Sequence, residues 1–210
     1  MITIYHLDNS RSERIIWLME ELGLPYEQET FMRDQGMAPA AMKAIHPLGK
    51  APLIRDGEQV VMESGAIVEY ILARYGNGKL RPDVASAAFP HYLEWLHYAE
   101  GSLMSALLRE FMVNRMLGDK TAESPVSKGL ASRTHDILAV IDGELAKAPY
   151  FAGRDFTAAD IMMEFCFSFM HRYAKQSVTS YRHLEAWLER VRSRPAYQRT
   201  MATAAPQVIY

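Results

Sequence analysis

Apolar and polar positions alternate between strand-like and helix-like patterns over the first 80 residues. Residues 2–7 form a short β-branched and aromatic run, which predicts a buried strand. Residues 12–22 carry a wide apolar stripe at helical spacing, and Gly23 and Pro25 end the predicted helix. Residues 26–31 alternate in polarity and predict a second strand. A right-handed crossover between these two strands makes them parallel.

The pattern over the rest of the first 80 residues predicts a short helix, a hairpin and a last helix. Residues 38–45 are rich in Ala and Met and favour a short or irregular helix. Asp56-Gly57 separates two apolar runs, which is a strong signal for a hairpin. Ser64 is expected to cap a helix that Gly76 closes. The predicted order is therefore β-α-β-α-β-β-α.

From about residue 85 the pattern becomes helical, with no strand signal of similar quality. The predicted helices cover 89–116, 125–146, 158 to about 173, 182–193 and 195–203. We therefore expect an α/β domain over residues 1–80 and an all-helical domain over 86–210, with the junction near 77–87.

Composition narrows the classes of protein. The chain has 210 residues, 49% hydrophobic and 23% charged, with 23 basic against 25 acidic side chains, so a basic surface for nucleic acid or an anionic membrane is not expected. No apolar stretch approaches the roughly 20 residues of a membrane span, and the start lacks the pattern of a signal peptide. The single cysteine, Cys166, excludes an internal disulfide and a cysteine-based zinc site. We expect a cytoplasmic protein without a metal.

The loop over residues 8–14 joins the first strand to the first helix. A helix N-terminus presents unpaired N–H groups and a partial positive charge, which stabilise an anion. Ser10 and Glu13 also fit an S-x-x-E capping box. Taken alone, this stretch favours a structural cap over a catalytic hydroxyl.

Two further motifs have both a structural and a binding interpretation. In the run H-P-L-G-K-A-P-L-I, a cis Ala51–Pro52 bond would leave the Ala51 backbone able to pair with an extended peptide, whereas a trans bond would make Pro52 an ordinary edge-strand proline. The isomer is left open. In E-S-G-A-I, the Ser64 hydroxyl and N–H can hold a carboxylate, and Glu63 can accept from an ammonium group. A plain helix cap explains this second motif equally well.

These three motifs, in this order and spacing, resemble the glutathione transferase family. The run from His6 to Tyr26 is similar to the bacterial and fungal branch of the family. The resemblance continues over residues 152–161, where Thr157 and Asp160 match the capping box of the family's C-terminal domain. It thus covers nearly the whole chain.

The resemblance implies a thioredoxin-like first domain that binds glutathione, a helical-bundle second domain and a homodimer. It also implies roles for particular residues. Glu63 and Ser64 would bind the γ-glutamyl end of glutathione, the backbone of Ala51, before Pro52, would pair with the cysteinyl part, and Lys50 would lie near the glycyl side.

Family members activate the thiol with Tyr, Ser or Cys at the start of the first helix. Here the resemblance favours Ser10, with Asn9 second and Ser12 third, and the absence of Cys at this place disfavours a mixed-disulfide mechanism. The resulting thiolate would attack an electrophilic co-substrate held between the two domains. Candidate residues for the co-substrate pocket, which fit a buried core equally well, are Leu107, Leu108, Phe111 and Met112.

The expected activity is conjugation of glutathione to small hydrophobic electrophiles, as in detoxification. Glutathione acts here as a co-substrate, and no separate cofactor is expected. One alternative is a glutathione-dependent disulfide or peroxide reductase, in which Asn9 polarises the thiol. The other is a non-catalytic binding module, which the intact set of Lys50, Ala51-Pro52 and Glu63-Ser64 disfavours.

Overall fold

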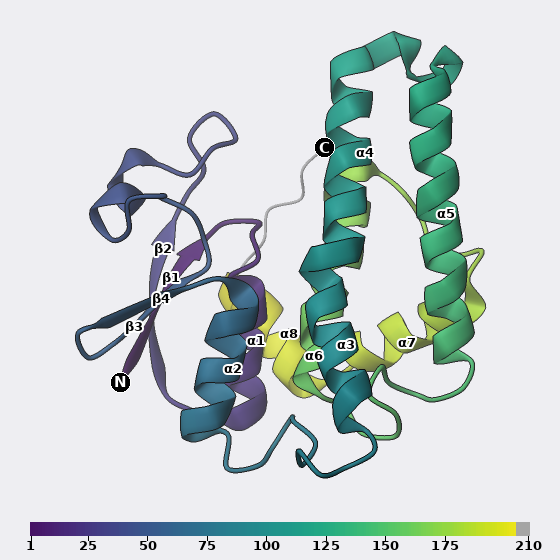
Figure 1. Ribbon diagram of the computed structural model, residues 1–210. Helices are drawn as coiled ribbons and strands as arrows, with labels where there is room; N and C mark the ends of the chain where they lie inside the picture. The colour runs from purple at the N-terminus through teal and green to yellow at the C-terminus, as the bar shows by residue number, and fades with distance from the viewer. Residues whose placement is uncertain (205–210) are drawn as a thin grey trace. The chain divides into compact units, whose positions relative to one another are not determined.

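The computed structural model describes residues 1–204, which divide into two compact units (Figure 1). The first unit comprises Met1–Arg81 together with the described residues from Val191 onward, and the second comprises Pro82–Arg190. The last residues of the expected helical domain, 205–210, lie outside the described part of the chain.

The first unit contains a four-stranded sheet in the order β2-β1-β3-β4. Strand β1 (Ile2–Leu7) is parallel to β2 (Tyr26–Phe31) and antiparallel to β3 (Leu53–Asp56), and β4 (Gln59–Met62) completes the hairpin. The parallel pair and the hairpin confirm the sequence prediction. Because Asp56 pairs with Gln59, the two-residue turn is Gly57-Glu58, and Gly57 supplies the positive φ of 60° that such a turn needs.

Helices α1 (Glu13–Leu22) and α2 (Ser64–Tyr75) lie next to each other on one side of this sheet (Figure 1). A short 3-10 helix (Ala40–Ala44) precedes β3, at the place where the sequence favours an irregular helix. The apolar stripe of α1 is buried because it faces the sheet and its neighbouring helices.

Helix α8 (Pro195–Ala204) belongs to the first unit, because it packs against α1. The rings of Trp17 and Tyr197 meet edge to face at 4.9 Å. Arg194 Nε lies 2.6 Å from Glu21 Oε1, and a second ion pair joins α8 to α1 nearby. Helix α8 therefore stabilises the same core as α1.

The second unit is helical throughout its named elements. These are α3 (Phe89–Tyr98), a π-helical segment (Ala99–Met104), α4 (Ser105–Leu117), a 3-10 segment (Gly118–Glu123), α5 (Pro125–Leu145), α6 (Ala158–Phe169), a second π-helical segment (Met170–Ala174) and α7 (Arg182–Arg192). The long helical runs expected from the sequence are confirmed. Helix α6 is buried on every side and forms the centre of the unit. None of the helices within residues 1–204 is long and apolar enough to cross a membrane.

The capping box at the start of α6 is confirmed, and its carboxylate does more than cap the helix. Asp160 is completely buried and accepts hydrogen bonds from Thr157 N at 2.9 Å and Phe151 N at 3.2 Å. It also accepts from Trp187 Nε1 at 2.9 Å. Burial raises the pKa of this carboxyl to about 6, against the opposing effect of these donors. Asp160 thus joins the start of α6 to α7 and to the preceding loop.

We therefore expect Asp160→Ala to lower the stability of the protein. The substitution leaves buried N–H groups of Phe151, Thr157 and Trp187 without their acceptor, at a cost of about 1–3 kcal/mol for each group. Thermal unfolding should show a clear fall in Tm, with the specific activity of the folded fraction unchanged. Asp155→Ala, an exposed carboxylate in the same loop, is the matched control. A variant that is as stable as the wild type but inactive would contradict this structural role.

Candidate functional site

The loop between β1 and α1 is almost completely buried, although its residues are polar. Asp8, Asn9, Ser10 and Ser12 are each exposed by 6% or less. Asn9 adopts a left-handed conformation with φ of 50°. The guanidinium of Arg33 donates to the carbonyls of Asp8 and Asn9, each at 3.0 Å, and so fixes the turn from the other side. Sequence analysis did not single out Arg33, because it lies in a loop without a motif.

The two leading candidates for thiol activation make different contacts. Asn9 Nδ2 donates to Asp8 Oδ2 at 3.1 Å. Ser10 Oγ lies 2.7 Å from Ser12 Oγ and accepts from Ser12 N at 3.3 Å. The expected S-x-x-E capping box is wrong, because the Ser10 hydroxyl turns towards Ser12, and Glu13 N binds the Ser10 carbonyl at 3.1 Å instead. Ser12 is the N-cap residue of α1.

A buried histidine lies behind these serines. His6 Nδ1 is 2.8 Å from Ser12 Oγ, and His6 Nε2 is 3.3 Å from the carbonyl oxygen of Ala204, at the end of α8. Burial lowers the pKa of the His6 imidazole. Sequence analysis overlooked His6, and the available signal was a titratable side chain within a strand predicted to be buried.

The second candidate motif lies at the start of α2. The helix begins at Ser64 and its N-cap residue is Glu63, so the expectation that Ser64 is the cap is wrong. Glu63 has φ of 71° and ψ of 123°, a conformation that side-chain-bearing residues rarely adopt. This backbone turn leaves Glu63 exposed and Ser64 buried in the first turn, where helix N–H groups lack intrahelical acceptors.

A buried arginine connects the two motifs. Arg14 is 1% exposed, and its Nη1 lies 3.5 Å from Ser64 Oγ. It belongs to the first turn of α1, so the start of α1 is joined to the start of α2. Sequence analysis did not single out Arg14, although a charged residue beside two apolar isoleucines was itself a signal.

The third motif comes directly before β3. The Ala51–Pro52 bond, whose isomer the sequence leaves open, is cis. Pro52 is buried, Ala51 is half-buried and Lys50 is exposed. These residues lie in the same unit as Ser10 and Ser64.

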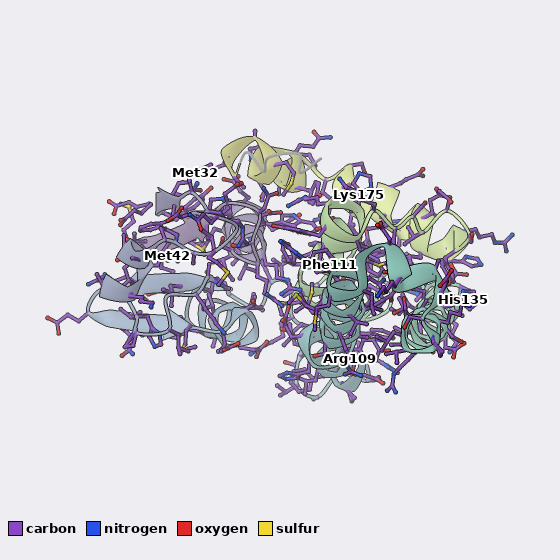
Figure 2. All side chains as sticks on the ribbon, turned by 90° about the horizontal axis from the view of Figure 1, so that it is seen from above. Met32, Met42, Arg109, Phe111, His135 and Lys175 are labelled. Carbon is purple, nitrogen blue, oxygen red and sulfur yellow. The ribbon has the colours of Figure 1, made fainter. Side chains whose placement is uncertain are left out.

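The second unit contains a cavity of about 200 Å³ beside α4. Of the four expected pocket residues, Leu107 and Phe111 line it, whereas Leu108 and Met112 do not. Phe111 projects from α4, and Lys175 marks the segment after α6 that supplies other lining residues (Figure 2). The rest of the wall is more polar than the sequence suggests; its residues are Glu110, Asn114, Arg115, Tyr173, Ala174 and Gln176.

Comparison with known proteins explains this combination of motifs. A model of the glutathione S-transferase N-terminal domain matches residues 4–79, and a model of the C-terminal domain matches residues 102–195. Glutathione S-transferase 3 of Schizosaccharomyces pombe is 36% identical over 207 residues, which cover 93% of this chain and 85% of that protein. The chain belongs to the glutathione S-transferase family.

Solved structures agree with this membership. A glutathione S-transferase from Actinobacillus pleuropneumoniae has a TM-score of 0.86 and 30% identity, covering 99% of this chain and 94% of that one. A glutathione transferase homologue from Sulfitobacter with bound glutathione has a TM-score of 0.79 at 18% identity, and shows the same fold; it covers 97% of this chain and 98% of that one. The transferase family consists of enzymes that use glutathione as a co-substrate. Within residues 1–204, the transferase has no cluster of three or more potential metal ligands of the His, Cys, Asp and Glu types.

Proposed function

We propose that this protein transfers the glutathione thiolate to small hydrophobic electrophiles, a reaction of detoxification. The observation that carries the proposal is the Ser10 hydroxyl, which is held by hydrogen bonds within a buried loop just before α1. In the same unit, Glu63 and Ser64 form the N-terminal turn of α2. A nucleophile-activating group and a site for an α-amino acid head are both available on one small scaffold.

The thiol needs activation because an ordinary thiol has a pKa of about 8.5 and is only a few per cent ionised at neutral pH. A hydroxyl that donates to sulfur stabilises the thiolate, and a helix N-terminus adds a partial positive charge. We take Ser10 as the first candidate for this task, as the family resemblance favours, and the Asn9 amide, one N–H of which donates to Asp8 at 3.1 Å, as the second.

Glutathione is proposed to bind along the Glu63–Ser64 turn and the Lys50–Pro52 segment. The carboxylate of the γ-glutamyl group fits the unpaired N–H groups at the start of α2, and the exposed Glu63 carboxylate fits its ammonium. The Ala51 backbone is proposed to pair with the cysteinyl part, and the Lys50 ammonium with the glycyl carboxylate.

The cavity of the helical unit is proposed to bind the co-substrate. Leu107 and the rings of Phe111 and Tyr173 supply its apolar and aromatic wall. The Phe111 and Tyr173 rings meet edge to face at 6.2 Å. Such a wall fits a small aromatic electrophile.

The first test of this function is the choice between Ser10 and Asn9. We expect Ser10→Ala to raise the pKa of the bound thiol and to reduce turnover with an aryl halide by up to about 10²–10³, the effect of losing one oxyanion donor. Glutathione affinity should change little. Asn9→Ala is the comparison, with thermal unfolding measured on both. Full activity in Ser10→Ala and none in Asn9→Ala would assign thiol activation to Asn9. If the wild-type protein were also more active with a disulfide substrate than with the aryl halide, the reductase would be favoured.

The second test concerns the head group of glutathione. A charge-assisted hydrogen bond contributes about 1.5–3 kcal/mol, so Ser64→Ala or Glu63→Gln should weaken glutathione binding about tenfold or more. Calorimetric titration measures this change. Glu58→Gln, an exposed acid in the neighbouring hairpin turn, should bind as the wild type does. Equal affinity in all four proteins would rule out the head-group assignment.

The third test concerns assembly. We propose a homodimer, because closed two-fold symmetry is the commonest state of soluble homo-oligomers and the family resemblance implies it. Light scattering should then give about twice the chain mass of 23.9 kDa. A particle with the mass of one chain that still binds glutathione would overturn the dimer and leave the glutathione site intact.

A further inference from the structure

Three side chains behind the proposed thiol site form a continuous buried line of hydrogen bonds. Ser10 Oγ lies 2.7 Å from Ser12 Oγ, which lies 2.8 Å from His6 Nδ1. His6 and Ser12 are fully buried and Ser10 is 6% exposed. Ser10, whose hydroxyl is proposed to contact the thiol, is therefore the end of this line that lies nearest to solvent.

The contacts of His6 decide which of its ring nitrogens carries the proton. Nε2 lies 3.3 Å from the carbonyl oxygen of Ala204, which can only accept a hydrogen bond. Nε2 is therefore the donor. In a neutral imidazole the other nitrogen is an acceptor. Nδ1 lies 2.8 Å from Ser12 Oγ, closer than the other acceptor, the Leu7 carbonyl at 3.3 Å, so we assign the Ser12 proton to Nδ1.

The same reasoning fixes the proton of Ser10. Ser12 Oγ gives its own proton to His6 and accepts from Leu7 N at 3.2 Å, which leaves one lone pair. At 2.7 Å, Ser10 Oγ must donate to that lone pair. Ser10 Oγ in turn accepts from Ser12 N at 3.3 Å, and its remaining lone pair is available to a ligand. Without glutathione, Ser10 therefore offers an acceptor rather than a donor.

His6 is the neutral far end of this line. Burial lowers the pKa of its imidazole, which leaves the ring neutral with a lone pair on Nδ1 but makes it a weaker base than an exposed histidine. The carbonyl of Ala204 and the negative charge of Asp8 act in the opposite direction and favour the imidazolium once it forms. Among the described residues, Asp8 is the charged side chain that acts on the ring.

We propose that the thiol proton of bound glutathione passes through Ser10 and Ser12 to His6. This proposal rests on the proposed function. The S–H bond breaks as Ser10 Oγ takes the proton, Ser10 gives its own proton to Ser12 Oγ, and Ser12 gives its own to His6 Nδ1. The products are a thiolate and an imidazolium, with no change in oxidation state and no proton lost to solvent.

The hydrogen-bond count is complete after the transfer as well as before it. The imidazolium donates to Ser12 Oγ and to the Ala204 carbonyl, and Ser12 Oγ still accepts from Leu7 N. Ser12 now donates to Ser10, and Ser10 donates to the thiolate. Every donor and acceptor of His6, Ser12 and Ser10 that is named here therefore keeps a partner when the direction of these hydrogen bonds reverses, and no buried polar group is left unsatisfied. His6 and Ser12 do not touch the thiol and act through Ser10.

We call this transfer from the thiol through Ser10 and Ser12 to His6 the relay. The proton balance of glutathione binding tests it directly. Two quantities are measured on the wild-type protein at neutral pH: the thiolate formed, from its ultraviolet absorbance, and the protons released, from calorimetric titrations in buffers of different ionisation enthalpy. The relay predicts that thiolate appears with no matching release of protons. If Ser10 only donates to a thiolate formed by loss of its proton to solvent, each thiolate releases a full proton equivalent, and the relay is overturned.

Variants separate the relay from a merely structural contact. His6→Asn keeps a polar side chain near Ser12 but cannot hold the proton, so proton release should now match thiolate formation. The bound thiol pKa should rise by about one unit or more, a tenfold loss of thiolate at neutral pH. Ser12→Thr keeps a hydroxyl and should retain the proton, whereas Ser12→Ala should release it. His91→Asn, an exposed histidine, is the matched control.

The outcomes also distinguish the relay from the proposed function. Thermal unfolding of each variant identifies loss of fold, and the wild-type proton balance decides the question even if a variant does not fold. Glutathione that binds and ionises with full proton release overturns the relay alone. Absence of glutathione binding to the wild type overturns the proposed function, and the relay with it.

Discussion

The hydroxyl of Ser12 is the contact on which the arrangement of the first unit's site depends. Its oxygen lies within 3.3 Å of four groups, which are His6 Nδ1, Ser10 Oγ, and the N–H and carbonyl of Leu7. It therefore joins the last residues of β1 to the first residues of α1. A polar atom at this buried position is stable only because each of its hydrogen-bonding capacities is used. The same contacts hold the loop that carries Asn9 and Ser10.

Other polar contacts connect this loop and the start of α1 to the rest of the unit. Arg33 holds the loop through two carbonyls, and Arg14 joins it to Ser64. The left-handed backbone of Glu63 is a costly conformation, typically by about 1–3 kcal/mol, and the surrounding packing must maintain it. Helix α8 packs against α1, and the carbonyl of its last described residue, Ala204, sets the tautomer of His6. A site that ionises a thiol depends on such fixed dipoles, because they are oriented before the charge appears.

The sequence predicted the regular elements and the places of the motifs, but not the contacts between the motifs. Strand β1, the hairpin and the capping box of Asp160 were predictable because each depends on residues close together in the chain. The partners of α8 were not, since Arg194 and Glu21 are far apart in sequence and either charge fits an exposed position.

Within the candidate site, the sequence does not predict the direction in which each side chain points. Ser10 and Ser64 both fit helix-cap patterns, yet Ser10 turns to Ser12, and Glu63 takes the cap position before Ser64. A capping motif states which hydrogen bonds are possible, whereas the tertiary structure decides which of them form. The sequence marks His6 as a titratable side chain in a buried strand, but its contacts with Ser12 and the Ala204 carbonyl follow from the tertiary structure.

The most direct test of this account is the nitrogen NMR spectrum of the His6 imidazole in the glutathione-free protein at neutral pH. Assignment by comparison with His6→Asn identifies the resonances, and their shifts report which ring nitrogen carries the proton. The hydrogen-bond network predicts a neutral ring protonated at Nε2, with Nδ1 accepting from Ser12. A ring protonated at Nδ1 would reverse the order of donors, and would contradict the orientation of the Ser10 hydroxyl on which the account depends.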